Sequence, residues 1–441
     1  MADERDGGCA RHSARKARTL PAWRSVTADP RTRHRRRRAD RRTRTCGGPG
    51  TAASSRLCRT SKPSGRRVIR PRAHVDALAP VYHGSISDAE LAGLGFRRDQ
   101  VIDFSVNSNP LGPSPAAIAA VQAATWSHYP DDRATVLRGE LACREGRGVE
   151  QVIVANGSSE LIWLLATAFI DPGQSAVVVG PTFGEYARAV RIAGGVIHEH
   201  RATPEDQFTV DFVAIEALAR DRRARIVFIC NPNNPTGVLA SIADIEALAL
   251  KLPESLIVVD EAYRPFVDEP RSSLPLTELD NIVLLRSLTK DYALAGLRLG
   301  YALAASAVVD ALDKVRPPWS VNVIAQIAGL AALGDEEHLR RGRDEVRRAR
   351  AYVTEALSAL ELRVLPSAAN YVLLDVGDAG MARSALLRHG IVVRDCTSFG
   401  LPNFIRVGLR TVQECERLVA ACEAADLASI GAPQCGAVSG P

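Results

Sequence analysis

Two groups of polar residues come directly after predicted buried strands. Asp260-Glu261-Ala262-Tyr263 ends one apolar run, and Arg286-Ser287-Leu288-Thr289-Lys290 ends another, with Arg298 eight residues beyond Lys290. Open α/β sheets bind ligands outside the carboxyl ends of their strands, so both groups are expected at a ligand site. Taken singly, Asp260 can be a helix cap, Lys290 an exposed lysine and Arg298 an ion-pair partner. Their order and spacing favour one shared site.

Two further segments belong to the same pattern. In Ala155-Asn156-Gly157-Ser158-Ser159-Glu160 a strand ends, a glycine turns the chain, and an apolar helix begins. Backbone N–H groups at such a helix start can bind an anion, although either serine can also be a simple N-cap. The second segment, Cys230-Asn231-Pro232-Asn233-Asn234-Pro235-Thr236-Gly237, follows a buried strand and is otherwise typical of a turn.

Together these motifs resemble those of the fold-type I pyridoxal-phosphate enzymes, the aspartate-aminotransferase superfamily, over essentially all of residues 82–425. The resemblance implies pyridoxal 5'-phosphate as cofactor, an electron sink that needs a lysine to carry it and a protonated ring nitrogen. Lys290 resembles that lysine, and Asp260 resembles the carboxylate that holds the proton. Asn234 and Tyr263 match the family's donors to the phenolic oxygen of the ring. The residues expected to be catalytic are Lys290, Asp260 and Tyr263.

The resemblance also implies how the rest of the cofactor is held. The expected phosphate-binding residues are Gly157, Ser158, Ser159, Ser287 and Arg298. Phe183 lies where the family stacks an aromatic ring on the cofactor, and plain core packing is its alternative. Tyr129, in His128-Tyr129-Pro130-Asp131, looks like the tyrosine that reaches the phosphate of the neighbouring subunit's cofactor. A homodimer is therefore expected, and no metal site is predicted.

Two arginines near the carboxyl end suggest the substrate. Arg406, in Phe404-Ile405-Arg406-Val407-Gly408, resembles the family arginine that binds the substrate carboxylate, for which the planar guanidinium is suited. Arg394 adds a second cation, which favours a substrate with a second anion, most simply a phosphate. The alternative is that Arg394 pairs with a protein acid such as Asp395 or Glu414.

Two members of the superfamily that act on phosphorylated substrates resemble this chain. The segments His83-Gly84, 103–112 and 318–322 are closer to threonine-phosphate decarboxylase of cobalamin biosynthesis. In that enzyme a histidine of a His-Gly-Gly motif lies near the substrate phosphate, although Ser85 here replaces the second glycine. We therefore expect an L-threonine O-3-phosphate decarboxylase-like enzyme acting on a phosphorylated amino acid or amino alcohol, with His83, Arg394 and Arg406 as substrate-binding residues. The alternative is a histidinol-phosphate-type aminotransferase that uses 2-oxoglutarate and glutamate.

The elements that position these residues follow from the apolar pattern. Continuous β-branched runs separated by helical patterns indicate an α/β fold with a large, mostly parallel sheet, followed by a smaller α+β domain. The predicted strands are 152–155, 176–179, 225–229, 256–260, 282–286 and 299–303, and then 370–376 and 404–407. The predicted parts are an Arg-rich disordered extension (1–75), an N-terminal segment packing with the small domain (76–125), the large cofactor-binding domain (126–320), the small domain (321–430) and a flexible tail (431–441).

Charge is distributed unevenly along the 441 residues. Residues 1–72 contain 22 basic and 5 acidic residues, whereas the remainder contains 34 basic and 45 acidic residues. The net charge of +6 is thus no sign of nucleic-acid binding by the folded part. An aminotransferase-like transcription regulator is less favoured, because residues 1–75 lack the apolar helical stripes of a winged-helix domain. Apolar stretches too short for a membrane span and nine cysteines without C-x-x-C spacing favour a cytoplasmic protein with free thiols.

Overall fold

A computed structural model describes residues 69–78, 86–268 and 272–430 of the chain. The predicted extension therefore lies outside the described residues up to residue 68, as do His83 and the predicted tail 431–441. Residues 73–75 of the predicted extension belong to a one-turn helix, α1 (Ala73–Asp76), that packs against α6 (Glu185–Ala193). The prediction of disorder through residue 75 is thus wrong for its last residues.

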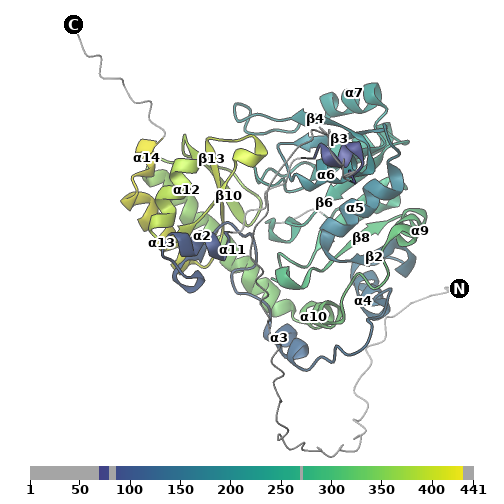
Figure 1. The fold of residues 1–441 in the computed structure, drawn as a ribbon, viewed down its shortest axis with the longest axis horizontal. Helices are drawn as coiled ribbons and strands as arrows, with labels where there is room; N and C mark the ends of the chain where they lie inside the picture. Colours follow the sequence, from purple (N-terminus) through teal and green to yellow (C-terminus); the bar gives the residue numbers. More distant parts are fainter. Residues whose placement is uncertain (1–68, 79–85, 269–271, 431–441) are drawn as a thin grey trace, which may run out of the picture. The chain divides into compact units, whose positions relative to one another are not determined.

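The larger sheet of the described residues has seven strands, several of which are labelled in Figure 1. Their order is β2 (Val152–Ala155), β8 (Gly300–Ala304), β7 (Ile282–Ser287), β6 (Leu256–Asp260), β5 (Ile226–Cys230), β3 (Ser175–Gly180) and β4 (Val196–Arg201). Strand β8 runs antiparallel to β2 and β7, and all other neighbouring pairs are parallel, so the predicted mostly parallel sheet is confirmed. The inner strands read as unbroken apolar runs because both of their faces are buried.

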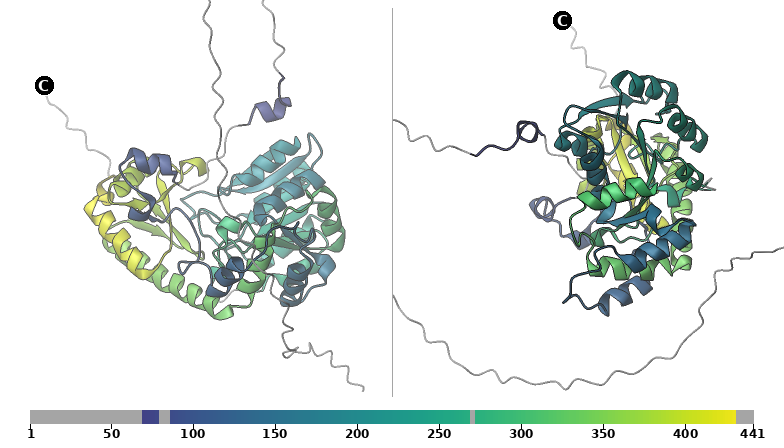
Figure 2. Two further views of the ribbon diagram at one scale, coloured as in Figure 1. Left: turned by 60° about the horizontal axis from the view of Figure 1, so that its bottom comes forward. Right: turned by 90° about the vertical axis from the view of Figure 1, so that its right-hand side faces the viewer.

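Alternate residues of these strands enter two apolar cores, one on each face of the sheet. The first core involves α5 (Gly157–Phe169), α6 and α9 (Ser306–Val315). The second involves α3 (Pro115–Gln122), α4 (Thr135–Glu145), α7 (Phe212–Arg222), α8 (Ile242–Lys251) and α10 (Val323–Leu333). Figure 2 shows the sheet between these helices. Strand β4 was missed by the sequence prediction because it is an edge strand with only part-buried and exposed residues.

The small domain is built on a four-stranded antiparallel sheet. Its order is β12 (Arg394–Asp395), β13 (Phe404–Gly408), β10 (Tyr371–Asp375) and β9 (Arg363–Leu365). Its core also involves α11 (Glu336–Ala359), α12 (Ala379–Arg388), α13 (Val412–Ala424) and α14 (Leu427–Ile430). A separate parallel pair joins β1 (Ile102–Asp103) to β11 (Ile391–Val392), and Ile102 and Phe104 enter this core. Across the described part of the chain, short 3-10 turns are formed by Arg98–Gln100, Val149–Gln151, Arg264–Phe266, Leu274–Glu278, Ala295–Leu297 and Thr397–Phe399.

The boundaries between the two cores differ from the predicted domain limits. Helix α10 lies in the core of the large sheet through Ala325, Ala328 and Ala332, and Val321, just before the helix, lies in the same core. The boundary predicted at residue 321 is therefore too early, because that helix is apolar on most sides and is covered by the large domain. The segment 76–125 is also divided: α2 (Asp88–Gly93) packs near α12, whereas Ala117 of α3 enters the large core.

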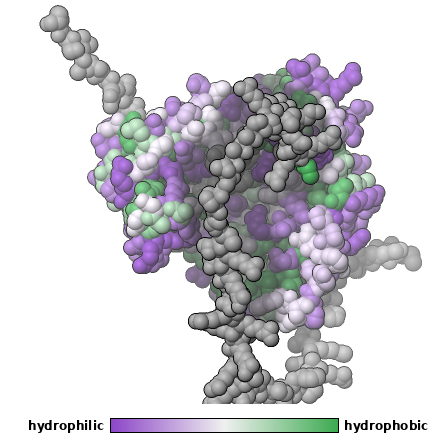
Figure 3. All heavy atoms as spheres, in the orientation of Figure 1, coloured by the Kyte–Doolittle hydropathy of each residue, from purple (hydrophilic) through white to green (hydrophobic). Residues whose placement is uncertain are grey.

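The surface of the described residues carries no long apolar helix. No helix among them is long and apolar enough to cross a membrane. Hydrophilic residues predominate on the coloured outer parts of the face in Figure 3, and apolar residues form small separate groups. The five cysteines of the described part, at positions 143, 230, 396, 415 and 422, are free thiols.

Candidate active site

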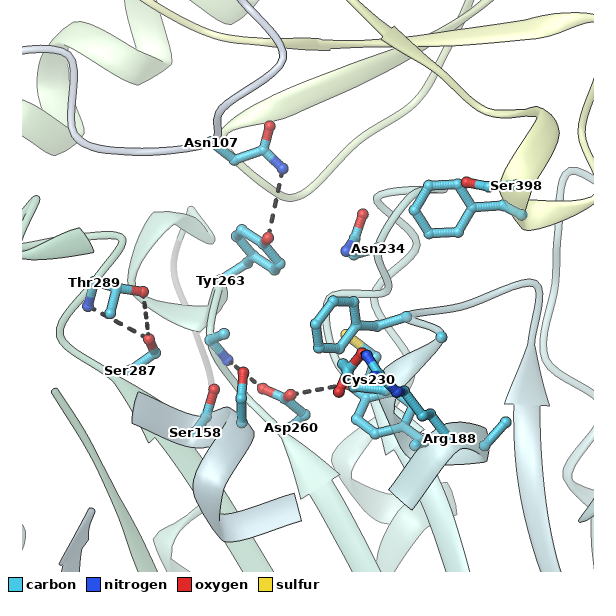
Figure 4. A pocket seen from close by; sticks show the side chains of 18 of the residues that line it. Asn107, Ser158, Arg188, Cys230, Asn234, Asp260, Tyr263, Ser287, Thr289 and Ser398 are labelled. Atoms are coloured by element: carbon cyan, nitrogen blue, oxygen red, sulfur yellow. Dashed lines mark hydrogen bonds and ion pairs between the residues drawn. The ribbon is translucent and has the colours of Figure 1, made fainter. Parts of the chain in front are cut away.

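A cavity of about 1000 Å³ lies at the carboxyl ends of the parallel strands and extends to the small domain. Of the residues predicted from sequence, it brings together Ser158, Ser159, Phe183, Asn234, Asp260, Tyr263, Ser287, Lys290, Arg298, Arg394 and Arg406. Figure 4 shows several of them converging from different strands and loops. Parallel strands end at one edge of the sheet, which is why motifs more than a hundred residues apart in the chain meet here.

One wall of the cavity is a cradle of backbone and hydroxyl groups at the start of α5. Gly157 has a φ of +79°, and a Cβ added there would lie 2.8 Å from Nη2 of Arg298. A Cβ on Gly300 would lie 2.6 Å from the backbone nitrogen of Ser158. Ser287 adds a hydroxyl that is 2.7 Å from Oγ1 of Thr289. The N–H groups of a helix start, two hydroxyls and a guanidinium make a site for an anion.

Asp260 lies on the floor of the cavity at the end of β6 and is only 4% exposed. Its Oδ2 accepts a hydrogen bond of 2.8 Å from the hydroxyl of Tyr186, and its Oδ1 accepts one of 3.0 Å from the backbone N–H of Ala262. Figure 4 marks both bonds. Burial raises the pKa of Asp260, while these two donors and the charge of Lys290 act in the opposite direction.

Tyr263 and Lys290 lie close together in the same cavity. Nζ of Lys290 is 5.6 Å from the centroid of the Tyr263 ring. The hydroxyl of Tyr263 accepts a hydrogen bond of 3.5 Å from Nδ2 of Asn107, whose Oδ1 is buried and has no hydrogen-bond partner in the structure. Asn109 holds the turn that carries the lysine, since its backbone N–H and its Nδ2 donate to the carbonyls of Lys290 and Asp291.

The two arginines lie side by side on neighbouring strands of the small sheet. Arg394 of β12 is the direct cross-strand partner of Arg406 of β13, and both line the cavity. Arg406 is 7% exposed and donates to Oδ1 of Asn234 and, at 2.8 Å, to the carbonyl of Ser105. Its buried Nε has no hydrogen-bond partner among the residues that the structure describes. Arg394 donates to Oγ of Ser398 at 2.7 Å. Burial and the charge of Arg406 lower the pKa of Arg394.

The two acids considered as alternative partners of Arg394 both have other contacts, and the charge of Asp395 also acts on Arg394. Glu414 receives a hydrogen bond of 2.9 Å from Arg410 and closes the capping box of α13 with Thr411. Asp395 accepts the backbone N–H of Thr397 at 2.7 Å. The structure thus places the Arg394 side chain at the cavity that also contains Arg406.

The family model of class I and II aminotransferases matches residues 99–422 of this chain. The chain belongs to this family. A histidinol-phosphate aminotransferase from Symbiobacterium thermophilum is 41% identical over 330 residues, which cover 74% of this aminotransferase and 90% of that protein. The histidinol-phosphate aminotransferase from Natronomonas pharaonis is 39% identical over 329 residues, covering 74% and 91% of the two chains.

Solved structures of the same fold extend the comparison. The histidinol-phosphate aminotransferase from Sinorhizobium meliloti, in complex with pyridoxal-5'-phosphate, has a TM-score of 0.74 and 25% identity over 82% of this chain and 99% of its own. Aspartate aminotransferase from Thermus thermophilus with maleate has a TM-score of 0.68 and 26% identity over 80% and 100%. The predicted family, the fold and the dependence on pyridoxal 5'-phosphate are confirmed.

The residues of this aminotransferase fit the cofactor chemically. Gly157 has no Cβ, which lets the guanidinium of Arg298 approach the start of α5, where a phosphate group would bind. The buried carboxylate of Asp260 suits a protonated ring nitrogen, because a buried anion needs a cationic or strongly donating partner. The orphaned Oδ1 of Asn107 and Nε of Arg406 mark polar atoms of the cavity that a bound molecule can satisfy.

Three predicted residues need separate comment. Tyr129 is 78% exposed and lies with its ring 4.6 Å from that of Trp319, outside the residues that line the cavity. Phe183 lines the cavity and also contacts the ring of Tyr186 edge-on at 5.7 Å, so cofactor stacking and core packing remain compatible. His83 lies outside the described residues, and its predicted role stays a prediction.

Sequence reasoning missed several residues of the cavity, chiefly Tyr186, Asn107 and Arg188. Arg188 lies 3.4 Å from Glu185 and over the ring of Trp163. Asn107 stands in the segment 103–112, which was noted for its resemblance to the decarboxylase and not for a contact with Tyr263. Tyr186 looks like any core aromatic residue in a helix pattern, and only its position beside Asp260 distinguishes it.

Proposed function

We propose that this chain is a histidinol-phosphate-type aminotransferase, which exchanges an amino group between a phosphorylated amine and the 2-oxoglutarate/glutamate pair. The observation that carries the proposal is the pairing of Arg394 with Arg406 across β12 and β13 at the cavity. Two adjacent guanidinium groups suit either a phosphate dianion or a carboxylate. The relatives of about 40% identity that bear the histidinol-phosphate aminotransferase name support the same substrate class.

Each residue has a proposed role toward the cofactor. Lys290 carries it, Asp260 holds the proton of its ring nitrogen, and Tyr263 and Asn234 donate to its phenolic oxygen. Because Arg406 donates to Oδ1 of Asn234, the Nδ2 donors of this amide are directed away from the arginine. The phosphate is bound by Gly157, Ser158, Ser159, Ser287 and Arg298, and Phe183 covers the ring. When bound, pyridoxal phosphate supplies an electron sink for a carbanion at the substrate Cα.

The remaining chemistry belongs to the side chains of the cavity. Arg406 and Arg394 bind the anionic group of the substrate and fix the orientation of its Cα–H bond. The amine of Lys290 would then take the proton from Cα as a general base and transfer it to the cofactor as a general acid, because a proton returned to Cα would only give back the substrate. Tyr263 lies within 5.6 Å of this amine, measured from its ring centroid, and orients it. Residues of the small domain line one side of the cavity and limit the access of water to the proton transfer.

The predicted threonine-phosphate decarboxylase and its place in cobalamin biosynthesis gain no support from the comparisons, which favour the aminotransferase alternative. The transcription-regulator alternative gains none either. Decarboxylation and transamination use the same cofactor residues and differ in which bond of the substrate stands perpendicular to the ring. That orientation depends on how the arginines are placed in space, which the motifs at 83–84, 103–112 and 318–322 do not encode.

The experiment that tests the function uses the purified protein loaded with pyridoxal phosphate. It is supplied with histidinol phosphate and 2-oxoglutarate, and glutamate formation is followed. A parallel reaction contains O-phospho-L-threonine, with CO2 release as the measurement, and Lys290→Ala is the control for both. We expect glutamate without CO2. Release of CO2 without glutamate formation would restore the decarboxylase.

We also propose that the enzyme is a homodimer in which Tyr129 reaches the partner's cofactor phosphate. The exposure of Tyr129, together with the exposed aromatic residues Trp126 and Trp319, supports this arrangement. Mixing Lys290→Ala chains with Tyr129→Ala chains tests it, because a mixed dimer contains one site with both residues intact. Activity that rises on mixing supports shared sites, and activity that stays at the sum of the two variants excludes them.

A further inference from the structure

The hydroxyl of Tyr186 is buried directly against the carboxylate of Asp260. The side chain of Tyr186 is 1% exposed, and the distance between its hydroxyl oxygen and Oδ2 of Asp260 is 2.8 Å. Oδ1 of the same carboxylate is engaged by the backbone N–H of Ala262. Thus each oxygen of Asp260 accepts one hydrogen bond from the protein and retains a lone pair for a further donor.

The position of this hydroxyl is set by the packing of its ring. Tyr186 lies in the first turn of α6, stacked on Phe228 of β5 with ring centroids 5.2 Å apart and an interplanar angle of 13°. Phe183 contacts it edge-on at 5.7 Å. Two aromatic neighbours therefore prevent the ring from swinging away, and the donor is aimed at Asp260 before any ligand binds.

The charges around Asp260 make this donor effective. Burial raises the pKa of Tyr186 well above its ordinary value, so the hydroxyl keeps its proton and donates. Cys230, the register partner of Asp260 on β5, is a neutral thiol because burial raises its pKa to about 12. Lys290 favours the charged carboxylate, and the neighbouring Glu261 opposes it. Among these groups, Tyr186 makes the direct side-chain hydrogen bond.

We propose that Tyr186 is a positioning residue that keeps Asp260 ionised and oriented, so that Asp260 can hold a proton on the ring nitrogen of the cofactor. The proposal rests on the pyridoxal-phosphate dependence of the family and not on the identity of the substrate. A hydrogen bond to a buried charge is stronger than one between neutral groups, and its loss leaves the carboxylate more basic. Tyr186 acts through Asp260 and not on the substrate.

The test uses Tyr186→Phe, which removes the hydroxyl and keeps the ring. The dissociation constant of pyridoxal phosphate is measured for variant and parent from pH 5 to 8, and their ratio is taken so that the cofactor's own titrations cancel. The folded-state pKa of Asp260 is higher in the variant, so its carboxylate is protonated at a higher pH on acidification. We expect the dissociation constant of the variant divided by that of the parent to be near one at pH 8 and to rise about tenfold toward pH 5, which means weaker cofactor binding by the variant in acid.

Two further measurements separate this role from simple packing. A cofactor analogue whose ring nitrogen is replaced by carbon has no proton for Asp260 to hold. The ratio of the dissociation constants of variant and parent for this analogue should therefore not vary with pH. The ¹⁵N resonance of labelled pyridoxal phosphate should move toward the unprotonated form in Tyr186→Phe. Incorporation of 3-fluorotyrosine at position 186, a stronger donor, should shift both readouts in the opposite direction.

Tyr301→Phe is the matched control, because Tyr301 is also a buried tyrosine that donates to a carboxylate, that of Glu145, on the opposite face of the sheet. It should leave the pH dependence and the ¹⁵N resonance as in the parent. The proposal is overturned by a constant ratio for pyridoxal phosphate, by the same rise with the analogue, or by the same rise in Tyr301→Phe. None of these readouts uses an amino substrate, so failure of the proposed aminotransfer leaves this test intact.

Discussion

Replacing Arg394 by alanine tests whether the second guanidinium recognises a second anion. The structure places Arg394 opposite Arg406 across two strands, with one of its donors on Ser398 and its guanidinium 5.4 Å from the ring of Phe399. A charge-assisted hydrogen bond contributes about 1.5–3 kcal/mol, which corresponds to about ten- to a hundredfold in kcat/KM. Because Arg394 is only part-buried, solvent screens some of this interaction, so we expect kcat/KM to fall by at least about tenfold, the lower end of that range.

The assay compares histidinol phosphate with its unphosphorylated alcohol at fixed 2-oxoglutarate. The loss in kcat/KM should be confined to the phosphorylated substrate, and the visible spectrum of the bound cofactor should stay as in the parent. Arg388→Ala is the matched control, since Arg388 is an exposed arginine of the same domain outside the cavity. The reasoning is wrong if kcat/KM of Arg394→Ala equals that of the parent for every phosphorylated substrate. It is also wrong if kcat/KM falls equally for the phosphorylated substrate and the unphosphorylated alcohol. Arg406 would then be the single anion-binding residue of an ordinary amino-acid aminotransferase.

Four other predictions test separate parts of the structure. Lys290→Ala should abolish turnover and the visible absorbance of lysine-bound cofactor, and a reducible covalent linkage in this variant would exclude Lys290. Removal of residues 1–68, which contain few large apolar side chains, should leave Tm and kcat unchanged, so a large fall in either would contradict the prediction. Gly400→Ala should lower the stability by about 1–2 kcal/mol, measured as a fall in Tm, because Gly400 has a φ of +72° and a Cβ would lie 2.5 Å from Nη2 of Arg201; an unchanged Tm would refute this. Burial raises the pKa of Asp291 from 3.8 to about 7, so the folded form retains a proton there and its contribution to stability falls as pH rises between these values. The Tm of Asp291→Asn minus that of the parent should therefore be larger at pH 8 than at pH 5. An equal difference in Tm at both pH values would count against this prediction.

The sequence by itself determined the elements whose residues are buried on both faces. Strands β2 and β6 begin and end at the predicted residues, because continuous apolar runs bounded by polar residues leave little choice of where a strand begins and ends. It also determined that Asp260 and Lys290 share a site. Parallel strands end at one edge of the sheet, so motifs at successive strand ends meet whatever lies between them.

The tertiary structure decided what the local pattern leaves open. Strand β4 forms because β3 offers it a free edge, and α10 joins the large core because that surface covers its apolar sides. The pairing of Arg394 with Arg406 and the contact of Tyr186 with Asp260 join segments that are adjacent only after the sheets have formed. The choice between transamination and decarboxylation belongs to the same level, because it depends on the direction in which a substrate bond is held, and direction is a property of assembled side chains.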